Sequence, residues 1–163
     1  MSMKASRHLF LELILKPDLN DPLADSVALD IRNDLKIKGL KRVRLGEAYY
    51  FLNSGLKEKN LVEIAEKILV DPVMQSYSIN KLNYSGFNWL VKVFYHDNIT
   101  DNVALVALQA FRDIKINLDK SQIKSARHYY LSGKLGRKEV EFIAKKLLSN
   151  DNVESFEIVK GRN

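Results

Sequence analysis

Residues 64–79 read IAEKILVDPVMQSYSI, and residues 143–158 read IAKKLLSNDNVESFEI. The two stretches align without a gap at an offset of 79 residues, and six positions carry the same residue in both. The shared residues are Ile64, Ala65, Lys67, Leu69, Ser76 and Ile79, which return as Ile143, Ala144, Lys146, Leu148, Ser155 and Ile158. This many identities at one offset indicate a duplicated chain. We therefore expect a function that two linked copies of a small unit can perform.

Each half predicts the same series of elements. In the first half, alternating apolar residues over 9–16 predict a strand, and Asp21 followed by Pro22 predicts the start of a helix over residues 22–35. Two short strands over 43–45 and 49–52 are expected next, with a bend or bulge at Gly46 between them. A helix over 61–69 and a strand over 74–80 complete the order β-α-β-β-α-β. The second half repeats this order at an offset of 80, which falls to 79 before the last helix.

The predicted fold class is α+β, with two tandem β-α-β-β-α-β repeats that form antiparallel sheets with the helices on one face. We expect the first repeat over residues 1–82, a linker over 83–86 and the second repeat over 87–163. A unit of this size buries only ~60% of its unfolded surface, so the halves are expected to pack together as a pseudo-dimer. Face-to-face and edge-to-edge packing of the two sheets are both compatible with the sequence.

Composition restricts the function classes. The chain of 163 residues contains 46% hydrophobic and 28% charged residues, which is typical of a folded soluble protein. It has no cysteine, which excludes disulfides, thiolate catalysis and thiolate metal sites. The apolar runs are too short for a membrane span, and we expect a cytoplasmic protein with no membrane partner. The net charge of +6 is distributed among interleaved acidic residues, so no nucleic-acid partner is expected.

No arrangement of residues predicts a catalytic centre. The three histidines, His8, His96 and His128, lack the spacing of metal ligands, and His96 before Asp97 is better explained as a turn residue than as a general base. The pairs Tyr49-Tyr50 and Tyr129-Tyr130 are interpreted as packing residues rather than as platforms for RNA bases. We therefore expect no catalytic residues, no cofactor-binding residues, no cofactor and no metal site.

The first half contains, in this order, the motifs Leu15-Lys16-Pro17, Asp21-Pro22, Val27, Val43-Arg44-x-Gly46, Glu66-Lys67-Ile68-Leu69-x-Asp71-Pro72-Val73 and Tyr77. In content and order, these motifs resemble the small (PurS) subunit of phosphoribosylformylglycinamidine synthase. The resemblance covers about residues 8–80, whereas the second half keeps only the hydrophobic pattern. Asn102, Ala126 and Asp151 stand there in place of Pro22, Gly46 and Pro72, and in the first half Glu47 replaces the basic residue usual in the family.

The resemblance implies a noncatalytic component of a larger C–N ligase. Members of the family join a glutaminase subunit to a large ATP-dependent synthetase subunit, and together these make formylglycinamidine ribonucleotide from glutamine-derived ammonia in purine biosynthesis. A fused pair of PurS-like repeats implies that one chain supplies a dimer of this small subunit. The chain is then either a free subunit or the N-terminal domain of a single-chain synthase, and the sequence leaves open whether it associates further with itself. Arg44, Gly46, Glu47 and Tyr50 are the expected interface residues. A tandem ligand-sensing α-β plait is the alternative function, and an RNA-binding module is the third.

Overall fold

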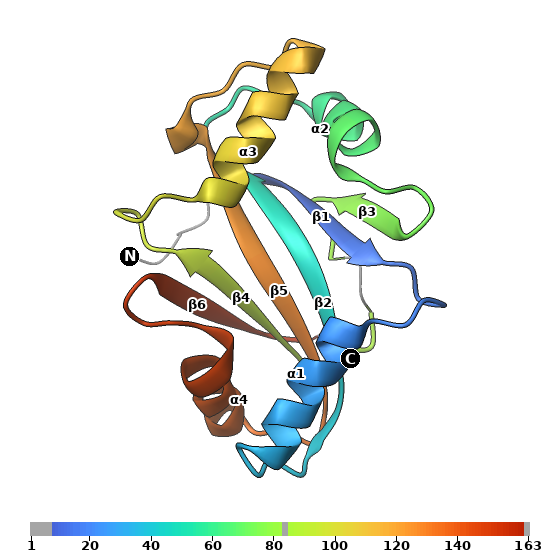
Figure 1. Ribbon diagram of the computed structural model, residues 1–163, viewed down its shortest axis with the longest axis vertical. Helices are drawn as coiled ribbons and strands as arrows, with labels where there is room; N and C mark the ends of the chain where they lie inside the picture. The colour runs from blue at the N-terminus through green and yellow to red at the C-terminus, as the bar shows by residue number, and fades with distance from the viewer. Residues whose placement is uncertain (1–7, 83–84, 162–163) are drawn as a thin grey trace.

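The computed structural model describes residues 8–82 and 85–161, which form one six-stranded antiparallel sheet and four α-helices (Figure 1). Residues 83 and 84 of the expected linker lie outside the described residues. The first half contains, in order, β1 (Leu9–Leu15), α1 (Pro22–Asn33), β2 (Leu40–Phe51), α2 (Glu58–Ile64) and β3 (Gln75–Ile79). The second half contains β4 (Trp89–Tyr95), α3 (Asn102–Phe111), β5 (Ile123–Gly133), α4 (Arg137–Ile143) and β6 (Glu154–Lys160).

Each half has three strands rather than the expected four. The segments predicted as separate strands over 43–45 and 49–52 belong to the single long strand β2, which pairs with its neighbours through Gly46 without a bulge. The irregularity lies earlier, between Leu40 and Arg42. The prediction of a bend at Gly46 was wrong, because the backbone there stays extended. The glycine instead makes room for the side chain of Glu12, as described below.

The first helix of each half begins with a side-chain cap. The carboxylate of Asp21 accepts a hydrogen bond from the Ala24 amide at 3.0 Å, and Pro22 opens α1. Asp101 caps α3 in the same way, accepting from the Ala104 amide at 2.9 Å. These bonds satisfy an amide group that has no partner within the helix, which explains why each helix begins where it does.

Each half contains a π-helical turn at the equivalent place in its sequence. A π-helical turn, Ala65–Leu69, follows α2, and another, Ala144–Leu148, follows α4. The Val70 amide donates to the Ala65 carbonyl at 2.9 Å, and the Ser149 amide donates to the Ala144 carbonyl at 3.0 Å. Because π-turns are uncommon, their recurrence 79 residues apart adds structural support to the duplication seen in the sequence.

The two halves join edge to edge through their long middle strands. The strand order is β3-β1-β2-β5-β4-β6, and β2 pairs with β5 along the interval from Leu40 opposite Gly133 to Phe51 opposite Ile123. Of the two packings that the sequence allows, the structure therefore adopts the edge-to-edge one. The short strand β3 and the strand β6 form the outer edges of the sheet.

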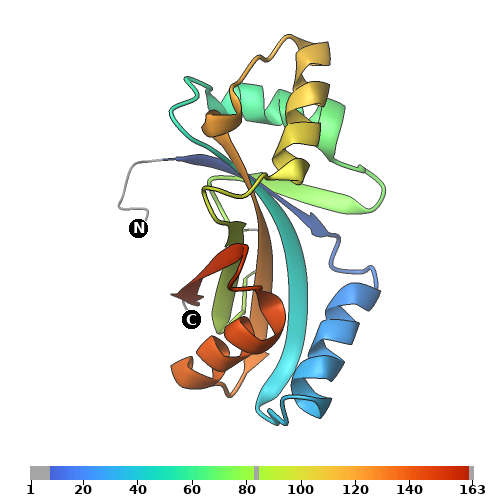
Figure 2. The ribbon, with the colours of Figure 1, turned by 60° about the vertical axis from the view of Figure 1, so that its left-hand side comes forward.

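All four helices cover one face of the sheet, and they pair across the boundary between the halves. Figure 2 shows α1 with α4 at one end and α2 with α3 at the other. One core cluster joins Ala28 and Ile31 of α1 to Ile143 of α4, and a second joins Leu61 of α2 to Phe111 of α3. Each core thus takes one helix from each half, because β2 and β5 are long enough to run under both helix pairs.

Ile64 and Leu69 of the first repeated stretch, and Ile143 and Leu148 of the second, are not equally buried. Ile64, Ile143 and Leu148 are buried, whereas Leu69 is only half-buried against the second cluster. Leu69 and Leu148 end equivalent π-turns, so the place of a leucine in the turn does not by itself decide its burial. No helix within residues 8–82 and 85–161 is both long enough and apolar enough to cross a bilayer.

Candidate functional site

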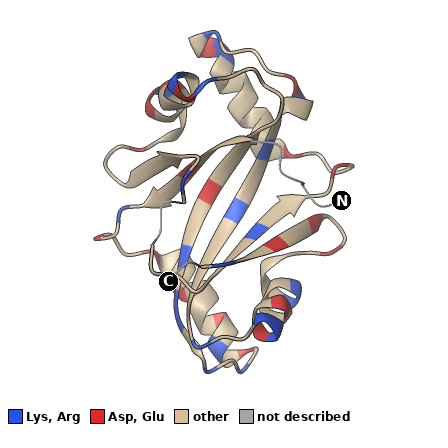
Figure 3. Ribbon diagram, turned by 180° about the vertical axis from the view of Figure 1, so that it is seen from behind, with Lys and Arg blue, Asp and Glu red and all other residues tan. Residues whose placement is uncertain are grey.

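The four residues expected at an interface all lie on β2, where the alternation of side chains divides them between two faces. Arg44, Gly46 and Tyr50 lie on the face opposite the helices, whereas Glu47 lies on the helix-covered face. Figure 3 views the sheet from behind, with the helices beyond it. The structure therefore does not bring the four side chains together into one patch.

Arg44 binds the loop between β1 and α1. Its guanidinium donates hydrogen bonds to the carbonyl oxygens of Leu15 at 2.9 Å, Lys16 at 3.3 Å and Leu19 at 3.4 Å. The side chain is half-buried. A planar guanidinium with five donors suits several carbonyls at once, so Arg44 holds this loop in place.

Gly46 leaves room for a carboxylate that crosses the strand. A Cβ atom at this position would lie 3.1 Å from Oε1 of Glu12, a residue of β1. Glu12 extends over Gly46 toward His128 on β5, which stands opposite Gly46 in the strand register. The glycine thus allows a side chain of the first strand to reach a strand of the second half.

Glu12 and His128 are the centre of a buried polar network between the halves. Oε1 of Glu12 lies 2.5 Å from Nδ1 of His128 and also accepts a hydrogen bond from the hydroxyl of Tyr130. The Tyr50 hydroxyl lies 2.9 Å from Nε2 of His128. Glu12, His128 and Tyr130 have no exposed surface, and Tyr50 is buried. Lys92 completes the surroundings, with Nζ 5.5 Å from the centre of the Tyr50 ring.

The protonation states follow from burial. Desolvation lowers the pKa of His128, against an opposing effect of the Glu12 hydrogen bond and charge, so the ring is neutral at pH 7. Desolvation, followed by the nearby carboxylate of Glu12, raises the pKa of Tyr50. The neutral ring therefore donates its Nδ1–H to Glu12, and its Nε2 accepts a hydrogen bond from the Tyr50 hydroxyl, so the donors and acceptors of the network match.

The network can form only between unlike halves. At the offset of 80, Tyr130 corresponds to Tyr50, but His128 corresponds to Ala48 and Lys92 corresponds to Glu12. Two first halves paired in the same way would each bury Glu12 against alanine, without the imidazole donor. Leaving a charge buried without its partner is costly, so the network favours pairing of the first half with the second.

Sequence reasoning missed this network. His128 was interpreted as one of three scattered histidines, and no role was assigned to Glu12. One signal for the network was present in the sequence. At the offset of 80, Glu12 corresponds to Lys92 and Ala48 corresponds to His128, although the strands that contain them otherwise repeat. Because Glu12 and His128 are enclosed on all sides, no substrate reaches them while the sheet is intact. The arrangement stabilises the join between the halves and offers no catalytic centre.

Acidification is expected to weaken the fold through His128. The unfolded chain protonates this histidine near its ordinary pKa of about 6.5, whereas the folded state resists protonation. The unfolded state therefore binds more protons below about pH 6.5, and stability falls with falling pH by up to about 1.4 kcal/mol per pH unit until the lowered folded pKa is reached. Urea unfolding between pH 8 and 5.5, compared with His128→Gln, measures this contribution. An NMR titration of the His128 ring with an ordinary pKa would contradict it.

Glu47 lies beside a small cleft at the centre of the helix-covered face, between the two helix pairs. Glu47 is exposed and stands opposite Arg127 of β5, whose guanidinium lies 2.5 Å from Oε1 of Glu154. Burial, and then the carboxylates of Glu47 and Asp101, raise the pKa of Tyr49 to about 12, so its hydroxyl remains protonated at neutral pH. The cleft has a volume of about 180 Å³ and an aromatic and apolar lining that includes Tyr49, Val93, Tyr95 and Val103. Aromatic side chains surrounded by a polar rim are a composition that protein–protein interfaces also have.

Comparison with known families agrees with the motifs of the first half. Residues 10–83 match the model of the PurS family, described as phosphoribosylformylglycinamidine (FGAM) synthase. The matched segment runs from β1 to just beyond β3 and does not include the second half. A search of curated proteins gave no match to the chain. The first half of the chain is thus PurS-like, and this likeness connects it with phosphoribosylformylglycinamidine synthase and purine biosynthesis.

Proposed function

We propose that this chain is a noncatalytic component of phosphoribosylformylglycinamidine synthase. In this role it joins a glutaminase subunit to a large ATP-dependent synthetase subunit, so that ammonia released from glutamine is used to make formylglycinamidine ribonucleotide. The observation that carries the proposal is the PurS family match over residues 10–83. The match favours neither a ligand-sensing plait nor an RNA-binding module. A cytoplasmic location is part of the proposal, since the reaction uses soluble metabolites.

The chain supplies a pair of PurS-like units as one molecule. Three observations support this part of the proposal: the same order of elements in both halves, the π-turns 79 residues apart, and the single sheet joined through β2 and β5. Covalent linkage raises the effective concentration of one half near the other to about mM, so the halves can diverge without losing their partner. The same assembly is expected whether the chain acts as a free subunit or as the N-terminal domain of a single-chain synthase.

The partner surface is proposed to involve Arg44, Gly46, Glu47 and Tyr50 in two ways. Glu47 is the exposed member, and we assign it a direct contact at the rim of the central cleft. Arg44 shapes the neighbouring loop, and Gly46 and Tyr50 hold the middle strands in register through the buried network. These three residues are proposed to support the partner surface indirectly, by holding the loop and the strands in place.

Stoichiometry tests the proposal. One copy of the chain is expected to saturate one copy of the large synthetase, because two PurS-like units are already present in one molecule. Calorimetric titration or native mass measurement of the purified pair gives the ratio directly. Glu47→Ala is expected to weaken the binding and leave the ratio unchanged. Two chains per synthetase would refute the fused pair, and the absence of any binding would refute the role in the synthase.

A further inference from the structure

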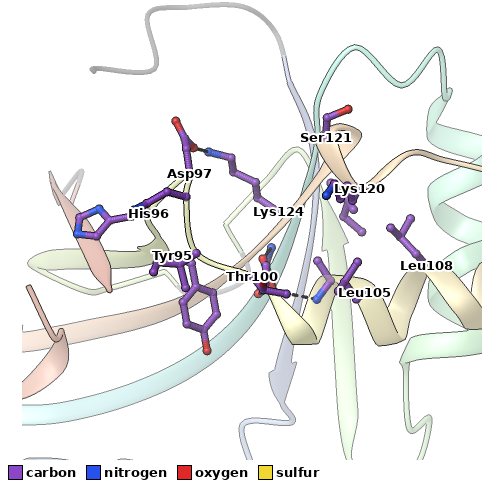
Figure 4. A pocket seen from close by; sticks show the side chains of 15 residues that line it. Tyr95, His96, Asp97, Thr100, Leu105, Leu108, Lys120, Ser121 and Lys124 are labelled. Carbon is purple, nitrogen blue, oxygen red and sulfur yellow. Dashed lines mark hydrogen bonds and ion pairs between the residues drawn. The ribbon is translucent and has the colours of Figure 1, made fainter. Parts of the chain in front are cut away.

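A cavity of about 470 Å³ lies in the second half, where the loop from β4 to α3 meets the segment before and within the start of β5 (Figure 4). Its walls combine the polar loop of residues 95–101 with Leu105 and Leu108 of α3. Lys120 and Lys124 are its two cations, and Asp97 and Asp101 are its two carboxylates. The formal charges of these four side chains cancel, so the cavity does not select a ligand through net charge alone.

The equivalent loop of the first half shows which kind of side chain this part of the fold binds. The loop that corresponds to residues 95–101 is residues 15–21, and there the guanidinium of Arg44 donates to the carbonyls of Leu15, Lys16 and Leu19. At the offset of 80 these three carbonyls correspond to those of Tyr95, His96 and Ile99, and all three residues line the cavity. In the first half, the side chain of Arg44 therefore occupies the position that corresponds to the cavity of the second half.

The two loops have the same conformation. The Leu19 amide donates to the Lys16 carbonyl at 3.0 Å, and the Ile99 amide donates to the His96 carbonyl at 2.9 Å. The caps of the following helices, described above, also match. Because the turns match, the carbonyls of Tyr95, His96 and Ile99 follow the same order along the loop as those that bind Arg44 in the first half.

The residue that corresponds to Arg44 does not occupy this position. Lys124 stands there in the sequence, and its ammonium forms an ion pair with the exposed carboxylate of Asp97, as Figure 4 shows. Asp97 itself corresponds to Pro17, so the acidic partner that draws the lysine away is particular to the second half. The Asp101 carboxylate is engaged by the amide of Ser125 at 2.7 Å and by its hydroxyl at 2.7 Å, which leaves the loop carbonyls as the acceptors for an incoming cation.

We propose that this cavity binds the guanidinium group of an arginine side chain presented by a partner protein, in the position that Arg44 occupies in the first half. The planar group donates to the carbonyls of Tyr95, His96 and Ile99, and its methylene stem lies along Leu105 and Leu108. A guanidinium fits these acceptors better than an ammonium, because its five donors point along fixed directions in one plane. The ligand chemistry is shared with free arginine, and the experiment separates the two sources.

The test uses the full chain labelled with nitrogen-15 and followed by NMR. N-acetyl-arginine amide is titrated at constant ionic strength, with N-acetyl-lysine amide as the matched probe. The arginine probe is expected to cause saturable shifts of the amide signals of residues 95–101 and 123–125, and the lysine probe to cause none. Equal binding of free L-arginine and of the blocked probe assigns recognition to the side chain, as a protein partner requires, whereas tighter binding of free L-arginine would overturn the assignment to a protein partner.

Two variants of Lys124, both made together with Asp97→Ala, give the decisive comparison, because Asp97→Ala removes the carboxylate that pairs with residue 124. In this background, Lys124→Arg places a guanidinium in the cavity from within the chain, as Arg44 does in the first half, and is expected to abolish the saturable shifts. Lys124→Ala leaves the loop carbonyls accessible and is expected to retain them. Both variants report their own folding through the dispersion of the remaining amide signals. Loss of binding in both variants, or equal binding of the arginine and lysine probes, would overturn the proposal.

Discussion

Replacing Glu12 by alanine is expected to lower the free energy of unfolding by about 3–5 kcal/mol, a large part of the stability of a domain of this size. The carboxylate is fully buried and accepts hydrogen bonds from the His128 ring and the Tyr130 hydroxyl. Its removal leaves two buried donors without an acceptor and opens a void over Gly46. The unpaired donors alone cost about 1–3 kcal/mol each.

Urea unfolding of the wild type and of Glu12→Ala measures this loss. Glu12→Gln keeps the volume and one acceptor oxygen, so a smaller loss is expected, which separates the hydrogen bonds from the packing. Glu47→Ala is the matched control, since it removes an exposed carboxylate from the neighbouring strand and should change stability by no more than about 0.5 kcal/mol. A loss for Glu12→Ala no larger than that of the control would show that the network contributes nothing to stability.

Replacing Leu148 by alanine is expected to cost about 2–5 kcal/mol and to shift the unfolding of the whole chain. Leu148 ends the π-turn after α4 and is 3% exposed. It belongs to a core cluster that also contains Ala28 and Ile31 of α1, from the other half. Since each core is built from both halves, neither half keeps a complete core when the other unfolds.

Calorimetry distinguishes one cooperative unit from two. A single transition is expected for the wild type, and Leu148→Ala should move the whole of it to lower temperature. Leu61→Ala, in the second cluster, should move the same single transition. Phe142→Ala is the control on the same helix, because Phe142 is 44% exposed and contributes little to the core. Two separate transitions, with only one of them moved by Leu148→Ala, would contradict the shared cores.

The local elements could be predicted from residues near one another in the chain. Alternation over residues 9–16 predicted β1, and the cap at Asp21 with Pro22 predicted the start of α1. The repeat at offset 79 predicted equivalent helices, and the structure adds the same π-turn to each. These features depend on backbone preferences and on a local apolar period, which a short window of sequence contains.

The division of β2 into two strands was wrong for a physical reason. Glycine inside a strand commonly marks a bulge, and no local signal says otherwise. Only the register of the three strands β1, β2 and β5 reveals that Gly46 makes space for the side chain of Glu12. A contact between residues 12 and 128 depends on strands that the sequence places more than a hundred residues apart.

The sequence by itself determined the α+β class and the PurS-like character of the first half, and it predicted two similar halves, because motifs and apolar periods can be read from neighbouring residues. The tertiary structure alone decided that the sheets join edge to edge, that α1 packs with α4 and α2 with α3, and that Glu12 meets His128. It also decided that Arg44 fills its loop while Lys124 turns toward Asp97. Each of these outcomes is a choice among long-range packings of similar local structures, and the choice depends on burial and on the pairing of polar groups across the join between the halves.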